Sequence, residues 1–474
     1  MSTDKAAVAD AIRIEDIMRK ATREAEKSSK LSPVFLKRDS FARTAISTGC
    51  LCLDWKMGGG IPPGRIVGIS GPERAGKTLL VTQILFNQVS TGGFGKLHDA
   101  EGSTDPLFLK ARGIDFDKFR GKRKKDGSLK DGEVDYIDFY QPTTIQEFAG
   151  YVQTLSSLLP ENRNPDRPLC IHVLDSVVAL ITDALEEDID ANKMAYHARM
   201  YSEYIPLVNA CLVKSGCTLI YTNQLRQKPG VKFGNPIYEP CGDTLKFFSS
   251  IRLMLNPFKP KLDDGDHPFL TKEMIPGVEV REGGIWEEPH YTEKGDVRGL
   301  DKYIYTGIKT VKNKVYTPYQ GCWMRINFEE NGSTGSGLDP VFDIFTFLYE
   351  TGYIRPATGV STTGKEKTIK GFYSVQPCKK LDPIKEFNMP EKFDYYEFKK
   401  WVHSRSDLVM ALRERMLVSG LVYEKEEEEP AMVIDDITDE ELEEQALAEV
   451  EKGLEDLEEE TKEIKKRGRK KREV

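Results

Sequence analysis

The stretch Gly71-Pro72-Glu73-Arg74-Ala75-Gly76-Lys77-Thr78 (GPERAGKT) has the pattern G-x-x-x-x-G-K-T, which is typical of a phosphate-binding loop. A strand-like run at residues 65–70 leads into the loop, and an apolar helical pattern at residues 79–89 follows it. In this setting the backbone N–H groups of the loop close around phosphate oxygens, and the helix N-terminus adds the positive end of its dipole. The sequence therefore predicts a nucleotide-binding site built from the whole loop.

Four side chains in and near the loop give this site its predicted chemistry. Lys77 would reach the β- and γ-phosphates of ATP, and the Thr78 hydroxyl would bind Mg²⁺. Asp175 ends an apolar strand pattern at residues 169–174, where a carboxylate would help to hold the same ion. Glu101 follows another expected strand and is placed to activate a water for attack on the γ-phosphate. An acid at such a position can also be no more than a solvated loop residue.

Length and composition restrict the class of protein. The 474 residues are enough for two or three domains, and 39% hydrophobic with 30% charged residues is typical of a soluble protein. Apolar runs fall short of the roughly 18 residues that a membrane span needs. The N-terminal residues lack the layout of a signal peptide. We therefore expect a cytoplasmic protein with no membrane contact.

The eight cysteines are expected to be reduced core residues rather than disulfides. Only Cys50 and Cys52 lie within five positions of each other, in a strand-like stretch. No CxxC pair or Cys/His cluster along the sequence indicates zinc.

The order of the patterns predicts an α/β fold with a mainly parallel sheet. Strand-like runs at residues 65–70, 169–174 and 218–222 alternate with helical patterns at residues 79–89 and 199–214, which is the order of repeated β-α units. Polar stretches at residues 120–134 and 257–299 interrupt this order, and we expect the second to be a long surface hairpin. We expect four parts in all: an N-terminal arm that caps the core or packs on a neighbouring chain (1–46), an α/β core with the nucleotide site (47–331), a small α+β domain (332–423) and a tail (424–474).

The tail is charged in two blocks of opposite sign. Residues 424–463 carry a net charge of −17 and residues 464–474 a net charge of +6, which leaves +3 for the rest of the chain. We expect either an acidic helix or disorder, since so many acids repel one another. The functional hypothesis is that the acidic block imitates DNA and competes for a cationic groove, or that it binds a partner.

A loop after the next expected strand has the composition of a single-stranded nucleic-acid contact. Residues 218–222 lead to Asn223 and Gln224, and residues 225–242 (LRQKPGVKFGNPIYEPCG) follow. Cations can contact phosphates, and rings can stack on bases. The residues of this loop that we assign to DNA are Arg226, Lys228, Lys232, Phe233 and Gly242. Composition alone would also allow an ordinary surface loop.

Together these segments closely resemble the RecA-type recombinases over residues 47–331. The segments that carry the resemblance are residues 47–54, 64–67, 71–78, 99–101, 105–106, 174–180, 223–224, 230–236 (GVKFGNP), 245–247 and 311–314 (VKNK). The resemblance implies a RecA-like P-loop ATPase core that binds ATP and Mg²⁺. It also implies filaments on single-stranded DNA, pairing with homologous duplex DNA, and single-strand-binding or loading proteins as partners.

The resemblance also implies roles for individual residues. Glu101 matches the residue that activates the attacking water, and Gln224 matches the residue that senses the γ-phosphate. Lys312 and Lys314 match lysines that reach the ATP of a neighbouring subunit, like an arginine finger. Asp105, Phe108 and Phe328 match positions that contact the adenine base of the nucleotide. Arg199 and Ser202 match positions that support DNA binding, beside a first DNA loop at residues 186–197.

The chain departs from the family pattern in several places. The paired glycines after the second DNA loop are replaced by Cys241-Gly242, and Pro206 stands where the family has an arginine. The first DNA loop is acidic at residues 186–190. The layout of residues 337–349 is more like virus-encoded members of the family.

The favoured function is ATP-dependent DNA strand exchange for homologous recombination and repair, by an enzyme that is a DNA-dependent ATPase. A RecA-core mediator that binds ATP and a protein partner is one alternative, and a ring-forming helicase motor is another. The full catalytic set, with Glu101, Gln224 and Lys312, speaks against a mediator. The second loop and the N-terminal helix favour a filament over a ring.

Overall fold

The structure is a computed structural model that describes residues 45–418, apart from residues 112–113, 123, 125–129, 131–134, 160–169, 182–192, 228–236, 259–278, 282–284, 292–296, 329–336, 361–365, 377–380 and 406. The described residues belong to one unit of the chain, Thr44–Val474. The expected N-terminal arm, the charged tail and the acidic stretch at 186–190 lie outside them, as do Lys228, Lys232 and Phe233.

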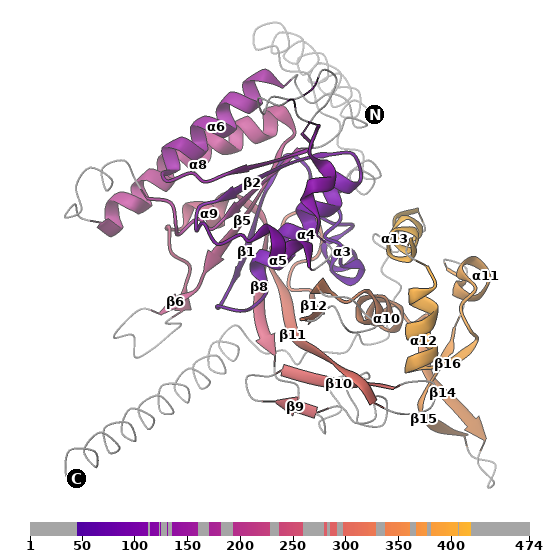
Figure 1. Ribbon diagram of the computed structural model, residues 1–474. Helices are drawn as coiled ribbons and strands as arrows, with labels where there is room; N and C mark the ends of the chain where they lie inside the picture. Colours follow the sequence, from indigo (N-terminus) through magenta and orange to yellow (C-terminus); the bar gives the residue numbers. More distant parts are fainter. Residues whose placement is uncertain are drawn as a thin grey trace, which may run out of the picture. The chain divides into compact units, whose positions relative to one another are not determined.

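The centre of the fold is a mixed sheet whose middle is parallel (Figure 1). Its order is β13-β12-β11-β8-β1-β5-β4-β2-β3, and the strands from β8 to β3 pair in parallel. Their bounds are β8 Ser249–Phe258, β1 Ile66–Gly71, β5 Thr218–Gln224, β4 Cys170–Asp175, β2 Phe94–Asp99 and β3 Ile137–Tyr140. This confirms the expected α/β core.

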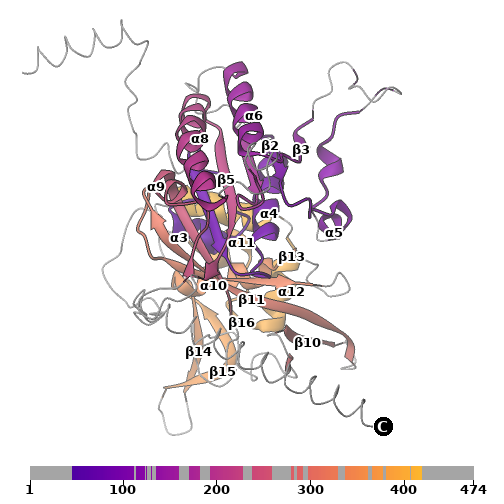
Figure 2. The same ribbon diagram turned by 90° about the vertical axis from the view of Figure 1, so that its left-hand side faces the viewer.

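Helices cover both faces of the parallel strands, which explains why these strands are continuously apolar. The helices are α3 (Leu51–Met57) and α4 (Lys77–Ser90) on one face, and α6 (Ile145–Leu158) and α8 (Lys193–Ser215) on the other. Side chains alternate between the faces: Val67 belongs to the core on the α4 side, whereas Ile66 belongs to the core on the α6 and α8 side. Figure 2 shows α6 and α8 side by side.

Antiparallel strands extend one edge of the sheet. These are β9 (Glu279–Arg281), β10 (Ile285–Tyr291), β11 (Val297–Asn313), β12 (Gly321–Asn327) and β13 (Gly337–Leu338). The expectation of a surface hairpin at residues 257–299 is wrong for β10, because Trp286 and Glu288 on this strand are buried. The sequence pattern was misleading here, since Glu288 is buried in ion pairs with Arg325 and Lys399, which lie outside the stretch.

The C-terminal residues form a small α+β unit packed on the α/β core. Its elements are α10 (Pro340–Glu350), β14 (Ile354–Val360), β15 (Glu366–Val375), α11 (Pro383–Phe387), β16 (Lys392–Asp394), α12 (Tyr395–His403) and α13 (Leu408–Val418). One hydrophobic cluster runs from β1 through α3 to α10, α12 and α13. The boundary expected at residue 332 stays a prediction, since packing is continuous across it.

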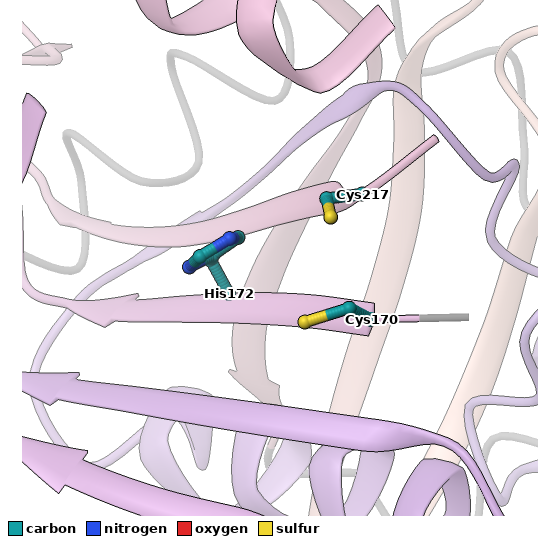
Figure 3. Close-up of side chains that lie close together, drawn as sticks. All are labelled: Cys170, His172 and Cys217. Atoms are coloured by element: carbon teal, nitrogen blue, oxygen red, sulfur yellow. The ribbon is translucent and has the colours of Figure 1, made fainter. Parts of the chain in front are cut away.

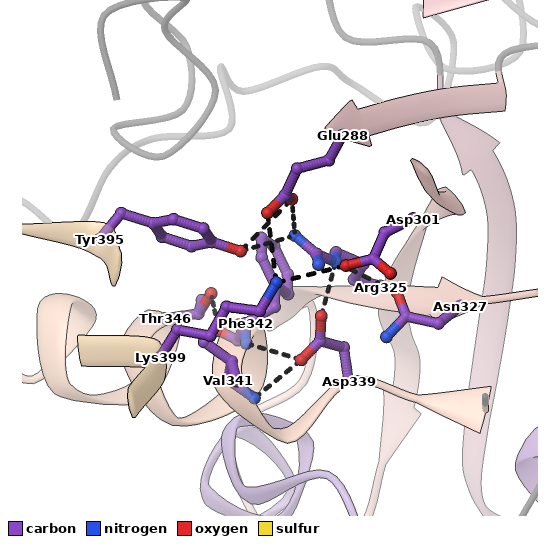
Figure 4. Close-up of polar contacts among 10 residues, drawn as sticks. All are labelled: Glu288, Asp301, Arg325, Asn327, Asp339, Val341, Phe342, Thr346, Tyr395 and Lys399. Atoms are coloured by element: carbon purple, nitrogen blue, oxygen red, sulfur yellow. Dashed lines mark hydrogen bonds and ion pairs between the residues drawn. The ribbon is translucent and has the colours of Figure 1, made fainter. Parts of the chain in front are cut away.

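A buried ionic network joins β10, β11 and β12 to the C-terminal unit (Figure 4). Arg325 lies 2.6 Å from Asp339 and 3.4 Å from Glu288, measured between nitrogen and oxygen atoms. Lys399 of α12 lies 3.3 Å from both Glu288 and Asp301. All five charged side chains are at most 9% exposed, so the network depends on its internal partners and not on water.

Candidate functional site

The phosphate-binding loop has the backbone that its sequence requires. It connects the end of β1 at Gly71 to the start of α4 at Lys77. Gly76 has φ +85°, and a Cβ there would lie 2.5 Å from Cδ1 of Ile326 on β12. Arg74 also has positive φ, at 62°. The second glycine of the motif is therefore required both by its φ and by the close approach of β12.

Lys77 points back over the loop. Its Nζ donates hydrogen bonds to the carbonyl oxygens of Gly71, at 2.9 Å, and Pro72, at 2.6 Å. Burial lowers the pKa of Lys77 below its ordinary value, although the nearby acids Asp175, Glu101 and Glu73 act in the opposite direction. The ammonium group is thus held at the mouth of the loop, where a phosphate would approach.

Thr78 and Asp175 form the oxygen pair expected for Mg²⁺. The Thr78 hydroxyl donates to Oδ2 of Asp175 at 2.7 Å, and the Thr222 hydroxyl donates to Oδ1 of the same carboxylate. Asp175 is 3% exposed, and burial raises its pKa above the ordinary value. A bound cation would offset that unfavourable burial, and Mg²⁺ prefers oxygen ligands. The residues present therefore fit the ion.

Glu101 lies where the carboxyl ends of three parallel strands meet. Its Oε1 accepts a hydrogen bond from the Ser176 hydroxyl, just beyond β4, and another at 3.3 Å from Nε2 of Gln224, at the end of β5. The backbone N–H groups of Ala100 and Glu101 both donate to the Asp175 carbonyl oxygen. The expected catalytic base, the expected γ-phosphate sensor and the expected metal ligand are thus brought together.

Gln224 is also connected to the second DNA loop. Two residues after it, β6 (Arg226–Gln227) pairs with β7 (Ile237–Tyr238), so the loop leaves the sheet as a short hairpin. Beyond β7, the buried carboxylate of Glu239 contacts Arg252 of β8 at 2.6 Å. The base of the loop is therefore attached to the sheet, and a displacement of Gln224 would be transmitted to it.

The described DNA-binding candidates gather where α8 meets α9 (Thr244–Phe248). Arg199 and Ser202 are exposed on α8, and the Ser202 hydroxyl lies 2.9 Å from the Thr244 hydroxyl. Gly242 has φ +76° and lies beside Ala198 of α8. Arg226 is exposed at the start of the hairpin. The contact of these residues with DNA stays a prediction.

Of the adjacent residues Cys241 and Gly242 only the second is glycine, yet both have the left-handed backbone. Cys241 has φ +72° and Gly242 has φ +76°. Cys241 is buried, and its thiol lies 3.8 Å from the carbonyl oxygen of Val177. A buried side-chain contact thus offsets part of the strain that positive φ imposes on a residue with a Cβ.

Lys312 and Lys314 lie against the C-terminal end of α9. Nζ of Lys312 donates to the carbonyl oxygens of Lys246 and Phe247, and Nζ of Lys314 lies 3.4 Å from the latter. Burial lowers the pKa of Lys312, and the positive charges of Lys314 and Arg252 lower it further.

Lys77 and Lys312 differ in the charged groups around them. The groups that influence Lys77 are Asp175, Glu101 and Glu73, whereas those that influence Lys312 are both cations. The two lysines therefore have different electrostatic surroundings within one chain.

Two of the three candidates for adenine contact belong to α5, and the third follows β12. Asp105 caps α5 (Pro106–Lys110) by accepting from the Leu107 N–H at 2.8 Å. Phe108 on α5 is 51% exposed, which leaves a ring face open to a base. Phe328 directly follows β12, whose Ile326 approaches Gly76. Their common role at adenine stays a prediction.

Sequence reasoning missed two hydroxyl groups and one cluster. Ser176 and Thr222 both bond to site carboxylates, and their positions at strand ends could have indicated this. Cys170, His172 and Cys217 lie together, although the sequence shows no Cys/His cluster.

Along the part of the chain that the structure describes, the helices are too short or too polar to cross a membrane.

Comparisons with known proteins agree with this site. A family model described as the RecA N-terminal domain matches residues 16–127 and 167–267. The protein RecA of Arthrospira platensis is 30% identical over 312 residues, which cover 65% of this chain and 67% of that relative. The RecA proteins of Thermus aquaticus and Thermus thermophilus are 29% and 30% identical over 328 residues, which cover 69% of this chain and 77% of each relative.

Proposed function

The chain belongs to the RecA family and acts in ATP-dependent DNA strand exchange, and we propose that it does so as a filament on single-stranded DNA, hydrolysing ATP to release the filament. The single observation that carries the mechanism is the hydrogen bond between Gln224 and Glu101. Gln224 directly precedes the expected DNA loop at residues 225–242, and Glu101 is the carboxylate that we assign to water activation. ATP hydrolysis and DNA binding are therefore coupled through one contact.

Each residue of the site has a defined task in this proposal. The loop N–H groups and Lys77 hold the phosphates, and Glu101 orients a water and takes its proton on a carboxylate oxygen. Thr78 and Asp175 would hold Mg²⁺, which neutralises charge on the phosphates. Gln224 can bond either to Glu101 or to the γ-phosphate, so its position reports which nucleotide is bound.

Assembly completes the site in this proposal. Lys312, at the end of β11, and Lys314, just after it, contact α9 carbonyl oxygens, and the surroundings of Lys312 differ from those of Lys77. We assign them to the ATP of the neighbouring subunit, where they would add positive charge to the transferring phosphoryl group. Hydrolysis then requires polymerisation, and ATP favours the filament because it binds that state more tightly.

Electron microscopy of Lys77 variants tests the proposal. With single-stranded DNA and a slowly hydrolysed ATP analogue, the wild-type protein should form helical filaments. Lys77→Ala and Lys77→Arg should form none in response to the nucleotide, because the phosphates lose their cation or its reach. Lys385→Ala is the matched control, since its side chain is 85% exposed and far along the chain in α11.

The particle shape separates the candidate functions. Rings from the wild-type protein would favour a helicase motor, and small particles that bind ATP would favour a mediator. Nucleotide-dependent filaments of Lys77→Ala would show that the loop is not the site at which ATP controls assembly.

A further inference from the structure

Three potential metal ligands lie together in the core, on the face of the sheet that α6 and α8 cover. They are Cys170 and His172 on β4 and Cys217, which directly precedes β5 (Figure 3). One ligand atom from each lies within 4.8 Å of the other two. Cys170 and His172 are two positions apart on one strand and so point to the same face. The pairing of Ile171 with Thr218 places Cys217 beside Cys170.

The cluster is closed to solvent. Cys170 is 6% exposed, and His172 and Cys217 are each 0% exposed. Nδ1 of His172 lies 3.1 Å from Nε2 of His98, whereas Nε2 of His172 is buried and makes no hydrogen bond to any part of the chain that the structure describes. A buried polar atom without a partner is unfavourable. The sulfur of Cys217 lies within the same cluster and interacts with the His172 ring. A shared cation would bind both groups.

His98 fixes which nitrogen of His172 is available. If the Nδ1–H of His172 donates to His98, the lone pair of Nε2 is left to bind a cation. This is the usual arrangement of a metal-bound histidine, whose second nitrogen donates to a neighbouring acceptor that orients the ring. The His98 ring is itself held by contacts with Phe148 and Tyr151 of α6. The cluster thus has both the ligands and the orienting partner of a metal site.

We propose that Cys170, His172 and Cys217 form a structural Zn²⁺ site inside the ATPase core. Thiolate and imidazole are the donors that zinc prefers, whereas Mg²⁺ prefers oxygen. Two thiolates and a neutral imidazole with Zn²⁺ have no net charge, which suits a site closed to bulk solvent. Zinc–sulfur bonds of about 2.3 Å require sulfur atoms roughly 3.8 Å apart in a tetrahedron. Small side-chain rotations within the 4.8 Å cluster provide that spacing.

A water molecule would complete the tetrahedron. The nearby Ser215 hydroxyl is already engaged, since it donates to the Cys211 carbonyl oxygen at 2.8 Å and accepts from the Cys217 N–H at 3.3 Å. A thiolate is the form of cysteine that binds metal, so each thiol loses its proton as the ion binds.

The position of the site predicts a role in stability and not in hydrolysis. Cys170 begins β4 and Asp175 ends it, so the site lies roughly 16 Å from the expected Mg²⁺ ligand at about 3.3 Å per residue. Zinc would fasten the start of β4 to the start of β5. The opposite ends of these two strands carry Asp175 and Gln224, so the ion would hold the strands on which the ATPase site depends.

Metal analysis of the full-length chain tests this inference. The wild-type protein, produced in zinc-containing medium and washed with a chelator, should retain about one zinc per chain, since a closed site releases metal slowly. Replacement by Co²⁺ during refolding should give a thiolate-to-cobalt charge-transfer band. Cys170→Ser/Cys217→Ser should lose the metal and the band. Cys211→Ser is the matched control on α8 and should keep both.

Two measurements on the wild-type protein keep the test decisive if the double variant does not fold. Zinc X-ray absorption should show two sulfur neighbours at about 2.3 Å and a nitrogen neighbour at about 2.0 Å. Refolding with zinc should give a higher Tm than refolding with a chelator. A wild-type chain without zinc, a zinc spectrum with no sulfur neighbours, or a cobalt band that persists in a folded double variant would each overturn the proposal.

Discussion

In the proposed mechanism, Glu101 is the residue at which ATP hydrolysis and DNA sensing meet. Its carboxylate accepts from Ser176 and from Gln224, and its backbone N–H bonds to the Asp175 carbonyl oxygen. Three strand ends therefore fix the position of one side chain. A carboxylate held in this way can accept a proton from water without first reorganising its surroundings.

Glu101→Gln should separate binding from hydrolysis. Glutamine keeps the shape and can still accept from Gln224, but it cannot take a proton from water. ATP binding and DNA binding should be unchanged, and phosphate release with single-stranded DNA should fall by at least about 10²-fold. Glu391→Gln, at an exposed position beside β16, is the control. Near-normal turnover of Glu101→Gln would assign the base to another residue.

The site residues that could be predicted from the sequence are those that belong to a short motif or lie at a recognisable strand end. The loop, Asp175 and Glu101 could be predicted because each lies in a short motif or at the end of an apolar strand. Cys170 and Cys217 could not, since they are brought together only by the pairing of β4 with β5. The role of Ser176 was missed because a hydroxyl after a strand is common and its partner is far along the sequence.

At the scale of elements, the sequence predicted the parallel core better than the antiparallel edge. Residues 66–71, 170–175 and 218–224 are strands as expected, because strands buried on both faces are apolar throughout. Residues 285–291 were misjudged because they lie in the polar stretch 257–299, which suggested a surface hairpin. Glu288 on this strand is instead buried, 3.4 Å from Arg325. A charged residue in the sequence therefore predicts solvent exposure only if no oppositely charged side chain pairs with it inside the fold.

Arg325→Met should test the buried network that holds the C-terminal unit. The substitution preserves volume but leaves Glu288 and Asp339 buried without their guanidinium partner. The expected loss is about 3–5 kcal/mol in the free energy of unfolding, measured by denaturant titration. Arg405→Met removes the same group from an exposed pair with Asp407, and its denaturation midpoint should not change. Equal effects of the two substitutions would contradict a role for burial.

A second contact between α10 and the core should make stability depend on pH. Asp343 of α10 accepts hydrogen bonds from the Leu51 and Cys52 N–H groups, at 2.5 and 3.0 Å, at the start of α3. Burial raises the pKa of Asp343 from 3.8 to about 6; the Cys50 thiol and these N–H groups oppose the rise, and Asp54 adds to it. Because the folded state binds this proton more tightly, its contribution to stability is complete below pH 3.8 and is lost as the pH rises through about 6.

The pH effect should be visible as a difference between two proteins. As the pH falls from 7 to 5, the Tm of the wild-type protein should rise relative to that of Asp343→Asn, which cannot bind the proton. Subtracting the variant removes the contributions of other titrating groups. A constant difference over this range would show that the pKa of Asp343 is not raised.

At the scale of the whole molecule, the described chain carries two halves of one proposed ATPase site. The first half is the loop with Lys77, Thr78 and Asp175, and the second is the lysine pair beside α9. Each lysine of the pair contacts carbonyl oxygens of α9, the helix that follows the expected DNA loop at residues 225–242. Neither lysine contacts the phosphate-binding loop of its own chain in these hydrogen bonds. A repeating head-to-tail contact between subunits would bring unlike halves together and would also generate a helical filament.

Mixing two inactive variants should therefore restore part of the activity. Lys77→Ala lacks the first half of the site, and Lys312→Ala lacks the second. In a random equal mixture, up to about a quarter of the head-to-tail contacts take both intact halves from different subunits. DNA-dependent ATP hydrolysis should rise to that fraction of the wild-type rate, because Lys77→Ala subunits can be carried into filaments by neighbours that bind ATP.

The control for this mixture is Lys312→Ala combined with the double variant Lys77→Ala/Lys312→Ala. No contact in that mixture contains both intact lysines, so hydrolysis should stay at the background of the separate proteins. Recovery in the first mixture alone would mean that Lys312 acts across the interface. If neither mixture recovers, although electron microscopy shows mixed filaments, both lysines act within one chain. The α9 contacts of Lys312 would then have to open for it to reach its own ATP, and hydrolysis would no longer require a neighbour.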